Sequence, residues 1–207
     1  AERDIPVSFV GNLGHKNNPE RRPFLDRFRR LQPLFTHTGP FVDIFTRSRI
    51  VLNQSADLEC NFRVFEAAGC GAALLTEAGT NGLTDLFVPG EDILPPYPRG
   101  DAALAAAIAG QALSDPDRCR EIGDAGQKKV LARHSARVRA RQITARAEAL
   151  IADQAWRRRK ENLDRVRSQM RTAFAFIATE LAPTPEYAPY ITLYQRLAEH
   201  YPPPSAR

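Results

Sequence analysis

The sequence has few of the residues on which disulfide-rich and metal-binding proteins depend. Its 207 residues include three cysteines, four histidines, one methionine and one tryptophan. The cysteines are odd in number and lack paired spacing, which argues against a disulfide framework or a zinc site and favours reduced thiols in a cytoplasm. The histidines lack metal-ligand spacing, so metal catalysis has little support. They are His15, His37, His134 and His200.

Long apolar runs are also absent. No segment is apolar over the length that a transmembrane helix or a signal peptide needs. The chain begins at Ala1 rather than Met and enters a predicted strand almost at once. We therefore expect a soluble protein cut from a longer polypeptide. Its apolar fraction of 43% and charged fraction of 26% are those of a globular domain with a sizeable core.

The net charge of +5 comes from one segment of the chain. Residues 133–171 hold eleven arginines and one lysine against four acidic residues, a net charge of +8, while the remainder carries −3. No recognised nucleic-acid-reading motif accompanies this charge. We expect a solvated face, or a face toward an acidic partner or a membrane surface, and no nucleic-acid binding.

Strand-like and helix-like apolar patterns alternate over the first 133 residues. Such alternation predicts an α/β fold, a doubly wound parallel sheet covered on both faces, with ligands at the carboxyl ends of the strands. The predicted strands are 5–10, 33–38, 49–53, 72–76 and 92–94, and the predicted helices are 20–31, 41–47, a helix around Glu66, 83–87, 101–113 and 116–133.

Helical patterns alone follow from about residue 150. Apolar residues recur at three- and four-residue intervals over 163–181, three prolines follow, and residues 190–201 suit one more helix. We predict a domain over residues 1–150 and a helical tail over 151–207. The apolar side of 163–181 suits packing on the tail's own domain, or a partner or oligomer surface.

The most informative stretch is FRVFEAAGCGAALLT, residues 62–76. Apolar residues surround Glu66, two glycines end the helix, and a buried strand follows. A carboxylate on a helix before a parallel strand can accept hydrogen bonds from a ribose diol, as acidic residues do in doubly wound nucleotide-binding folds. A solvated glutamate on an amphipathic helix has the same local pattern.

This stretch resembles the nucleotide-sugar-binding half of GT-B glycosyltransferases of the group 1 type. Their signature is two glutamates separated by seven residues, then a small-residue turn and a strand. The resemblance covers about residues 5–150 and is closest to a bacterial branch that includes spore-maturation proteins. It implies that a nucleotide diphosphate sugar, such as a UDP-sugar, is the donor substrate, and that the sugar is transferred with retention, without a bound metal or other cofactor.

The resemblance also implies which residues contact the donor. Glu66 matches the second glutamate of the signature, which holds the ribose. Gly11 opens the phosphate-side loop, in which Asn12 stands where the family commonly has arginine and Lys16 keeps the family's lysine. Arg63 is either a substitute for the missing cation or a surface arginine. The loop beside the donor diphosphate corresponds to Gly79, Thr80, Asn81 and Gly82.

The first glutamate of the signature is missing, because Leu58 stands eight positions before Glu66 and Glu59 is one place off. In the family that glutamate contacts the transferred sugar. Three functions therefore stay open: a glycosyltransferase domain with no catalytic residue assigned, a non-catalytic module that binds a nucleotide or a partner, and a nucleotide-sugar epimerase. The resemblance implies an acceptor domain, missing here and N-terminal in the same polypeptide, so this chain alone is expected to be an inactive half.

Other polar residues are weaker candidates. Asp57, Glu59 and Asp85 are carboxylates that could pair for acid–base catalysis, although the sequence gives no distance between them. The stretch 53–55, Asn-Gln-Ser, could contact the base or the sugar, or form an ordinary polar turn. We interpret His134 as structural.

Overall fold

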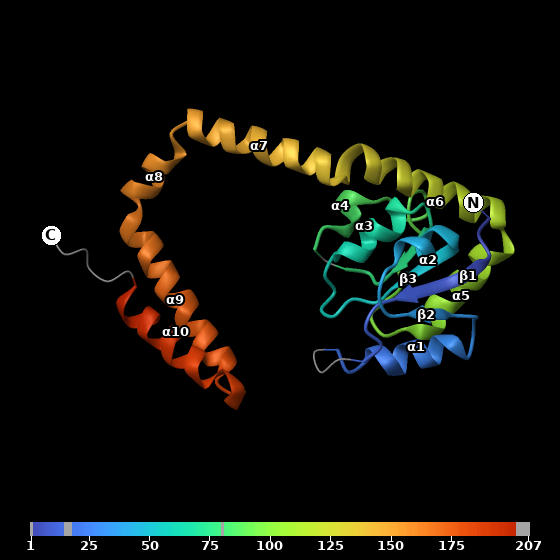
Figure 1. Ribbon diagram of the computed structural model, residues 1–207, viewed down its shortest axis with the longest axis horizontal. Coiled ribbons are helices and arrows are strands. Elements are labelled where there is room, and N and C mark those ends of the chain that lie inside the picture. Colours follow the sequence, from blue (N-terminus) through green and yellow to red (C-terminus); the bar gives the residue numbers. More distant parts are fainter. Residues whose placement is uncertain (1, 15–17, 80, 202–207) are drawn as a thin grey trace. The chain divides into compact units, whose positions relative to one another are not determined.

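The computed structural model describes residues 2–14, 18–79 and 81–201 (Figure 1). The chain divides into two compact units, unit 1 over Ala1–Ala140 and unit 2 over Arg141–Arg207. This division and the boundary expected at residue 150 both fall within one helix, α7 (Ala136–Ala152). None of the helices within the described ranges is long and apolar enough to cross a bilayer.

Unit 1 contains a four-stranded parallel sheet with the order β2-β1-β3-β4. The central strands are almost fully buried, as the continuous apolar runs of parallel strands require. Val7 pairs with Ile50, and Val51 pairs with Leu74. The strands are β1 (Ile5–Val10), β2 (Phe35–His37), β3 (Ser48–Asn53) and β4 (Ala73–Thr76).

Helices cover both faces of this sheet, which makes it doubly wound as predicted (Figure 1). One apolar cluster joins one face to α1 (Arg21–Arg29), α5 (Ala102–Ser114) and part of α6 (Pro116–Lys129). A second cluster joins the other face to four further elements. These are α2 (Val42–Arg47), α3 (Phe62–Gly69), α4 (Leu83–Leu86) and the π-helical turn η1 (Val130–His134).

Small residues and caps explain the positions of α5 and α6. Four buried alanines let α5 approach α1 and the sheet closely. The side chains of Asp101 and Asp115 cap α5 and α6 by accepting hydrogen bonds from backbone N–H groups at 2.9 and 3.1 Å. Gly123 brings α6 against β4, because a Cβ there would lie 2.5 Å from the carbonyl oxygen of Gly71.

Two element predictions were wrong in detail. Residues 92–94 do not form a strand, although Leu94 N–H donates to Leu74 O at 2.9 Å and Tyr97 N–H donates to Thr76 O at 3.1 Å. Three prolines around these residues lack the N–H that a ladder needs: Pro95, Pro96 and Pro98. The helix expected over 116–133 ends at Lys129 and continues as the π-helical turn η1.

Unit 2 is entirely helical. It contains most of α7, then α8 (Ala155–Glu161), α9 (Leu163–Leu181), the 3-10 turn η2 (Pro185–Tyr187) and α10 (Ala188–His200). The apolar side of α9 packs on α10, where the ring of Phe174 lies 6.0 Å from that of Tyr194 and 5.1 Å from that of Tyr201. Helix α10 begins two residues earlier than predicted because Pro189 occupies its first turn, where no N–H is needed.

Candidate functional site

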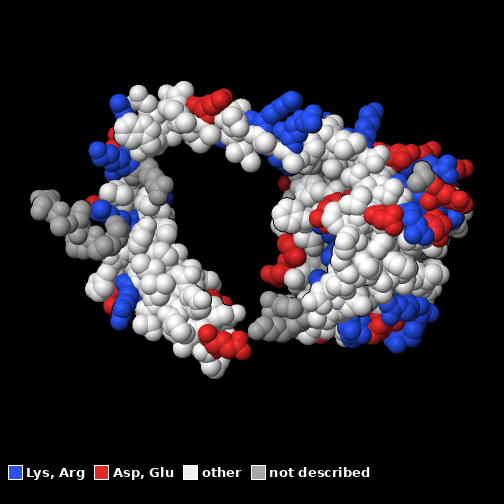
Figure 2. All heavy atoms as spheres, viewed as in Figure 1, with Lys and Arg blue, Asp and Glu red and all other residues white. Residues whose placement is uncertain are grey.

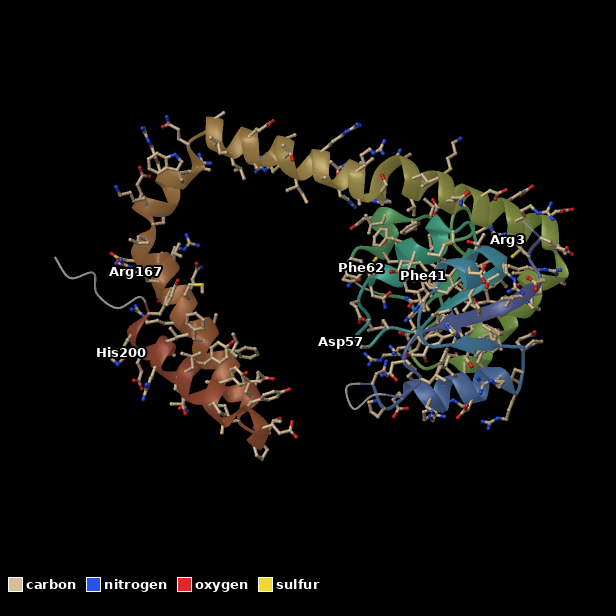
Figure 3. The ribbon with its side chains drawn as sticks, in the orientation of Figure 1. Arg3, Phe41, Asp57, Phe62, Arg167 and His200 are labelled. Atoms are coloured by element: carbon tan, nitrogen blue, oxygen red, sulfur yellow. The ribbon has the colours of Figure 1, made fainter. Side chains whose placement is uncertain are left out.

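The carboxyl ends of the strands carry the loops that the sequence analysis singled out. Figure 3 shows Asp57 and Phe62 at this end of unit 1 and Arg3 at the other. Gly11 follows β1 directly, and its N–H donates to His37 O at 2.9 Å. A Cβ at Gly11 would collide with Nη2 of Arg63. The structure therefore brings together two of the predicted site residues, and only glycine fits at this position.

Arg63 extends from α3 across the ends of the two central strands. Its Nε donates to Val10 O and its Nη1 to Asn53 Oδ1, both at 2.9 Å. The guanidinium carbon lies 4.7 Å from the centre of the Phe9 ring. Burial, and after it the like charge of Arg21, lowers the pKa of Arg63 to about 10. No carboxylate in the described part of the chain forms an ion pair with it.

Arg21 is a second guanidinium in this region, and the sequence analysis missed it. It opens α1, whose apolar face drew attention instead. Its Nε donates to Gln54 Oε1 at 2.8 Å, and its Nη1 donates to Asn12 O at 3.1 Å. Its guanidinium carbon lies 5.7 Å from the centre of the Phe9 ring. The signal that could have found it is its position at the first helical residue after the phosphate-side loop.

These two arginines repel each other, and within the described ranges neither forms an ion pair with an acid. Burial lowers the pKa of both arginines, and the nearby acids only partly offset it: Glu59 and Glu77 for Arg21, Glu66 and Glu59 for Arg63. An anion bound between the arginines would relieve both the desolvation and the repulsion. The electrostatics of this edge are therefore suited to a phosphate or diphosphate group.

The N-terminus of α3 adds N–H donors to the same edge. Asn61 is the N-cap residue, but its side chain does not cap the helix. Val64 N–H donates to Asn61 O at 3.2 Å, which leaves the N–H groups of Phe62 and Arg63 for an anion. Phe62, the first helical residue, is 84% exposed at this rim (Figure 3).

Glu66 lies one turn beyond Arg63 on α3. Its carboxylate is half-buried and accepts no hydrogen bond from any residue that the structure describes. It is close enough to Arg63 to raise the pKa of that group. An uncommitted carboxylate beside the arginine pair is the geometry that a ribose acceptor needs, and that role stays a prediction.

The loop before α3 explains how the missing first glutamate affects the site. Leu58 has a φ of +53°, an uncommon conformation for a residue with a branched side chain. The carboxylate of Glu59 accepts hydrogen bonds from Ala56 N–H at 3.1 Å and Asp57 N–H at 2.6 Å. Burial raises the pKa of Glu59, but the backbone hydrogen bonds outweigh it and the pKa falls. Glu59 therefore holds its own loop and does not replace the first glutamate.

Gly79 and Asn81 lie against the loop before α3. Asn81 Oδ1 accepts a hydrogen bond from Cys60 N–H at 3.1 Å, and a Cβ on Gly79 would lie 2.7 Å from Leu58 O. Gly82 has a φ of +88° and precedes α4. Thr80 lies outside the described residues, as do Lys16 and His15.

Asn12 does not replace the missing arginine as a cation. Its Oδ1 accepts a hydrogen bond from Gly14 N–H at 3.1 Å, so its side chain shapes the phosphate-side loop. The cations that the structure places beside Gly11 come instead from α1 and α3.

The stretch 53–55 is buried and serves the fold. Asn53 Nδ2 donates to Thr76 Oγ1 at 3.0 Å, and Tyr97 Oη donates to Asn53 O at 2.6 Å. Ser55 donates from its N–H and its hydroxyl to Glu77 Oε2, at 3.0 and 2.9 Å. Glu77 follows β4 and is 3% exposed, and the sequence analysis missed it. These contacts favour the interpretation of 53–55 as a structural turn.

The remaining candidates show no catalytic geometry. Asp57 is exposed and forms an ion pair with Arg99 at 3.5 Å. The ring of His134 lies 5.4 Å from that of Phe65 and 5.8 Å from that of Phe87. Burial lowers the pKa of His134, in keeping with a structural role.

A cavity of about 630 Å³ lies at the opposite, amino edge of the sheet. Arg3, Arg49 and Arg120 line it together with Glu2 and Asp124. The guanidinium of Arg3 already donates to four backbone carbonyl oxygens, those of Phe45, Thr46, Ser48 and Cys70. The carboxylates of Glu2 and Asp124 offset much of the positive charge in this cavity. The carboxyl edge, where Arg21 and Arg63 lie, is therefore the better anion site.

Comparison with known proteins decides the family. Residues 1–145 match the family model described as glycosyl transferase-like. The chain belongs to this glycosyltransferase family. No curated protein sequence matches it.

Solved structures identify the fold of this glycosyltransferase-family chain. HepE from Anabaena, in complex with UDP-glucose, is 13% identical with a TM-score of 0.58, over 71% of this chain and 50% of that one. The structure of HepE in complex with UDP is 14% identical with a TM-score of 0.60, and the match again covers 71% of this chain and 50% of that one. Sucrose-phosphate synthase from Thermosynechococcus elongatus is 16% identical with a TM-score of 0.58, and the match covers 74% of this chain and 47% of that one. Unit 1 thus has the Rossmann-like fold of a GT-B domain, and the chain spans about half the length of these proteins.

Proposed function

We propose that the carboxyl edge of unit 1 binds the nucleoside diphosphate part of a nucleotide-sugar donor. The observation that carries this proposal is the pair Arg21 and Arg63, two neighbouring guanidiniums without an acidic ion-pair partner in the described structure. Gly11 lets Nη2 of Arg63 lie against the loop after β1, and the uncapped N-terminus of α3 adds N–H donors. The HepE structures contain UDP and UDP-glucose, which makes a UDP-sugar the first donor to test.

The chemistry of such a site is electrostatic. Breaking the glycosidic bond leaves negative charge on the departing diphosphate, and fixed cations and N–H donors stabilise that charge. Arg63 is well suited to this role because its hydrogen bonds to Val10 and Asn53 hold it in place. Glu66 would accept hydrogen bonds from the ribose and fix the register of the donor. Transfer with retention and without a bound metal is part of the same proposal, as are contacts from Lys16 and the 79–82 loop.

The acceptor side of the reaction requires a second partner. A GT-B enzyme acts in a cleft between two domains, and this chain spans about half the length of the proteins it resembles. We therefore assign the acceptor wall to an N-terminal domain of the same polypeptide. The basic helical segment adds a candidate third partner, an anionic surface. The three cysteines are free thiols, which supports a cytoplasmic location.

A non-catalytic nucleotide-binding module is the second candidate. It is favoured by Leu58 and by the engagement of Glu59 within its own loop. An epimerase has less support. His37 contacts Gly11 through its backbone carbonyl oxygen, and in the described part of the chain no hydrogen bond joins a histidine ring to Arg63 or Glu66.

Isothermal titration of the chain with UDP, UMP and uridine tests donor binding. We expect affinity to rise from uridine to UMP to UDP, because each added phosphate meets the arginine pair. Equal affinity for uridine and UDP, or no binding of UDP, would contradict the proposal. Binding of UDP without transfer by the complete polypeptide would favour the non-catalytic module.

A further inference from the structure

Helix α7 presents an apolar strip that nothing in the described structure covers. None of its 17 residues is buried, and Ile143 and Ile151 are each 70% exposed. These two residues lie with Leu150 on one side of the helix, because residues spaced by three, four, seven and eight positions share a face. Alanines complete the strip: Ala136, Ala140 and Ala147.

Arginines flank this strip on both sides. At 100° per residue, Arg137 lies about 40° beyond Ile151 on one side of the strip and Arg146 about 40° beyond Leu150 on the other. Glu148 and then Arg141 lie further round on the side of Arg137. None of these three arginines forms an ion pair within the described ranges. Glu148 is the single acid in α7. Figure 2 shows basic side chains gathered over the first half of this helix and an acidic group near its end.

The beginning of α8 also combines an exposed apolar side chain with an arginine. Trp156 is 58% exposed, and the guanidinium carbon of Arg157 lies 5.3 Å from the centre of its ring. Tryptophan and arginine are side chains that settle at the boundary between water and lipid, where the ring or the stem lies in the apolar layer and the polar end stays hydrated.

We propose that α7 and the start of α8 dock on an anionic lipid bilayer. The apolar strip matches the acyl boundary, and the arginines on both borders match the phosphates of anionic headgroups. A nucleic acid would pair with the arginines but would leave Ile143 and Ile151 in water. A helix that stays in water on all sides gains no free energy from an apolar strip between arginines. This inference is independent of the donor site.

Sedimentation with lipid vesicles tests the proposal on the whole chain. We expect binding to vesicles of equal parts phosphatidylcholine and phosphatidylglycerol, and binding about tenfold weaker or more to phosphatidylcholine alone, because each basic residue near an anionic surface contributes separately. Binding to the mixed vesicles should fall at high salt. No binding to the mixed vesicles, or equal binding to both kinds, would overturn the proposal.

Two double variants separate the apolar strip from charge alone. Ile143→Gln with Ile151→Gln should weaken vesicle binding by about tenfold or more, because burial of the apolar strip is lost. Val42→Gln, at a residue of α2 that is 59% exposed, should bind as the unmodified chain does. Arg137→Gln with Arg141→Gln should also weaken binding, while Arg27→Gln with Arg30→Gln in and beside α1 removes the same charge and should not.

Failure of either α7 variant to weaken binding overturns the assignment of the surface. Binding of the same variants to a short DNA duplex is measured as well, to test the alternative of a nucleic-acid-binding face. If the duplex binds and only the arginine variants reduce its binding, the face is electrostatic and the lipid proposal is wrong. Because every substituted residue is exposed, thermal unfolding of all these variants should match that of the unmodified chain.

Discussion

At the scale of single residues, the donor proposal depends on how Arg63 is held. Its side chain is largely removed from water, lies against the Phe9 ring and uses Nε and Nη1 within the fold. Its Nη2 faces Gly11, where only a glycine leaves room. The protein maintains a cation in an unfavourable environment at the edge where α/β folds bind ligands, which is typical of a functional position.

Arg63→Gln should therefore reduce binding of UDP more than binding of uridine. We expect a loss of about 1–3 kcal/mol for UDP, the usual range for a hydrogen bond to a charged group. Arg27→Gln is the matched control, because Arg27 is exposed and lies on α1 nearly two turns after Arg21. Titration calorimetry measures both variants with both ligands. Equal losses for uridine and UDP would show that Arg63 has no phosphate role.

Glu66→Gln addresses the ribose contact. A glutamine keeps the size of the side chain but weakens its acceptance of two ribose hydroxyls, so the unmodified chain should prefer UDP over 2′-deoxy-UDP and the variant should not. The expected loss for UDP is about 1–3 kcal/mol. Competition between the two nucleotides measures the preference directly. A variant that keeps the preference would remove the ribose role from Glu66.

The sequence predicted part of this site and missed part of it for physical reasons. Gly11, Arg63 and Glu66 belong to local patterns that are visible in the sequence. Arg21 and Glu77 depend on which strand ends become neighbours, and that follows from the sheet order rather than from any local pattern. The stretch 53–55 looked like a binding loop because its residues are polar, whereas a buried hydrogen-bond network uses that polarity.

At the scale of elements, the sheet and its covering helices were predictable because each carries its own periodicity. The four strands and the helices of unit 1 lie within a few residues of their predicted bounds. The segment near residue 93 differs because its prolines cannot donate to a ladder. The π-helical turn η1 has no signal in the sequence that we can identify.

Gly123 tests how α6 positions β4 and the loop after it. Gly123→Ala should lower the free energy of unfolding by about 1–3 kcal/mol, because the new methyl group would overlap the backbone of residues 71–73. Gly69→Ala serves as the control, since its Cβ would lie 3.6 Å from Val130, an ordinary contact. Denaturant unfolding of both variants measures the difference. Equal stability of the two variants would contradict the packing described for α6.

At the scale of the whole molecule, our proposal makes this glycosyltransferase-family chain one wall of a two-walled cleft. The sequence analysis placed a helical tail after the domain, and the structure has a second, helical unit. How the tail relates to an acceptor could not be predicted, because periodicity shows which side of a helix is apolar and not what covers it.

The chain alone should not transfer sugar from any donor. Without a second wall, water is not excluded and the acceptor is not oriented, so a proximity contribution of up to about 7–11 kcal/mol is mostly lost. A turnover assay with several nucleotide sugars and a panel of acceptors checks this. Transfer above the rate without enzyme that disappears in Glu66→Gln would mean that the cleft is complete in this chain.

The most direct test of the donor proposal is to locate bound UDP by nuclear magnetic resonance on the isotopically labelled chain. Our account predicts that UDP shifts the amide signals of residues 11–14, 61–66 and 79–82, and that Arg63→Gln reduces these shifts. Shifts confined to the amino edge, around Arg3, Arg49 and Arg120, or no shifts at all, would contradict it.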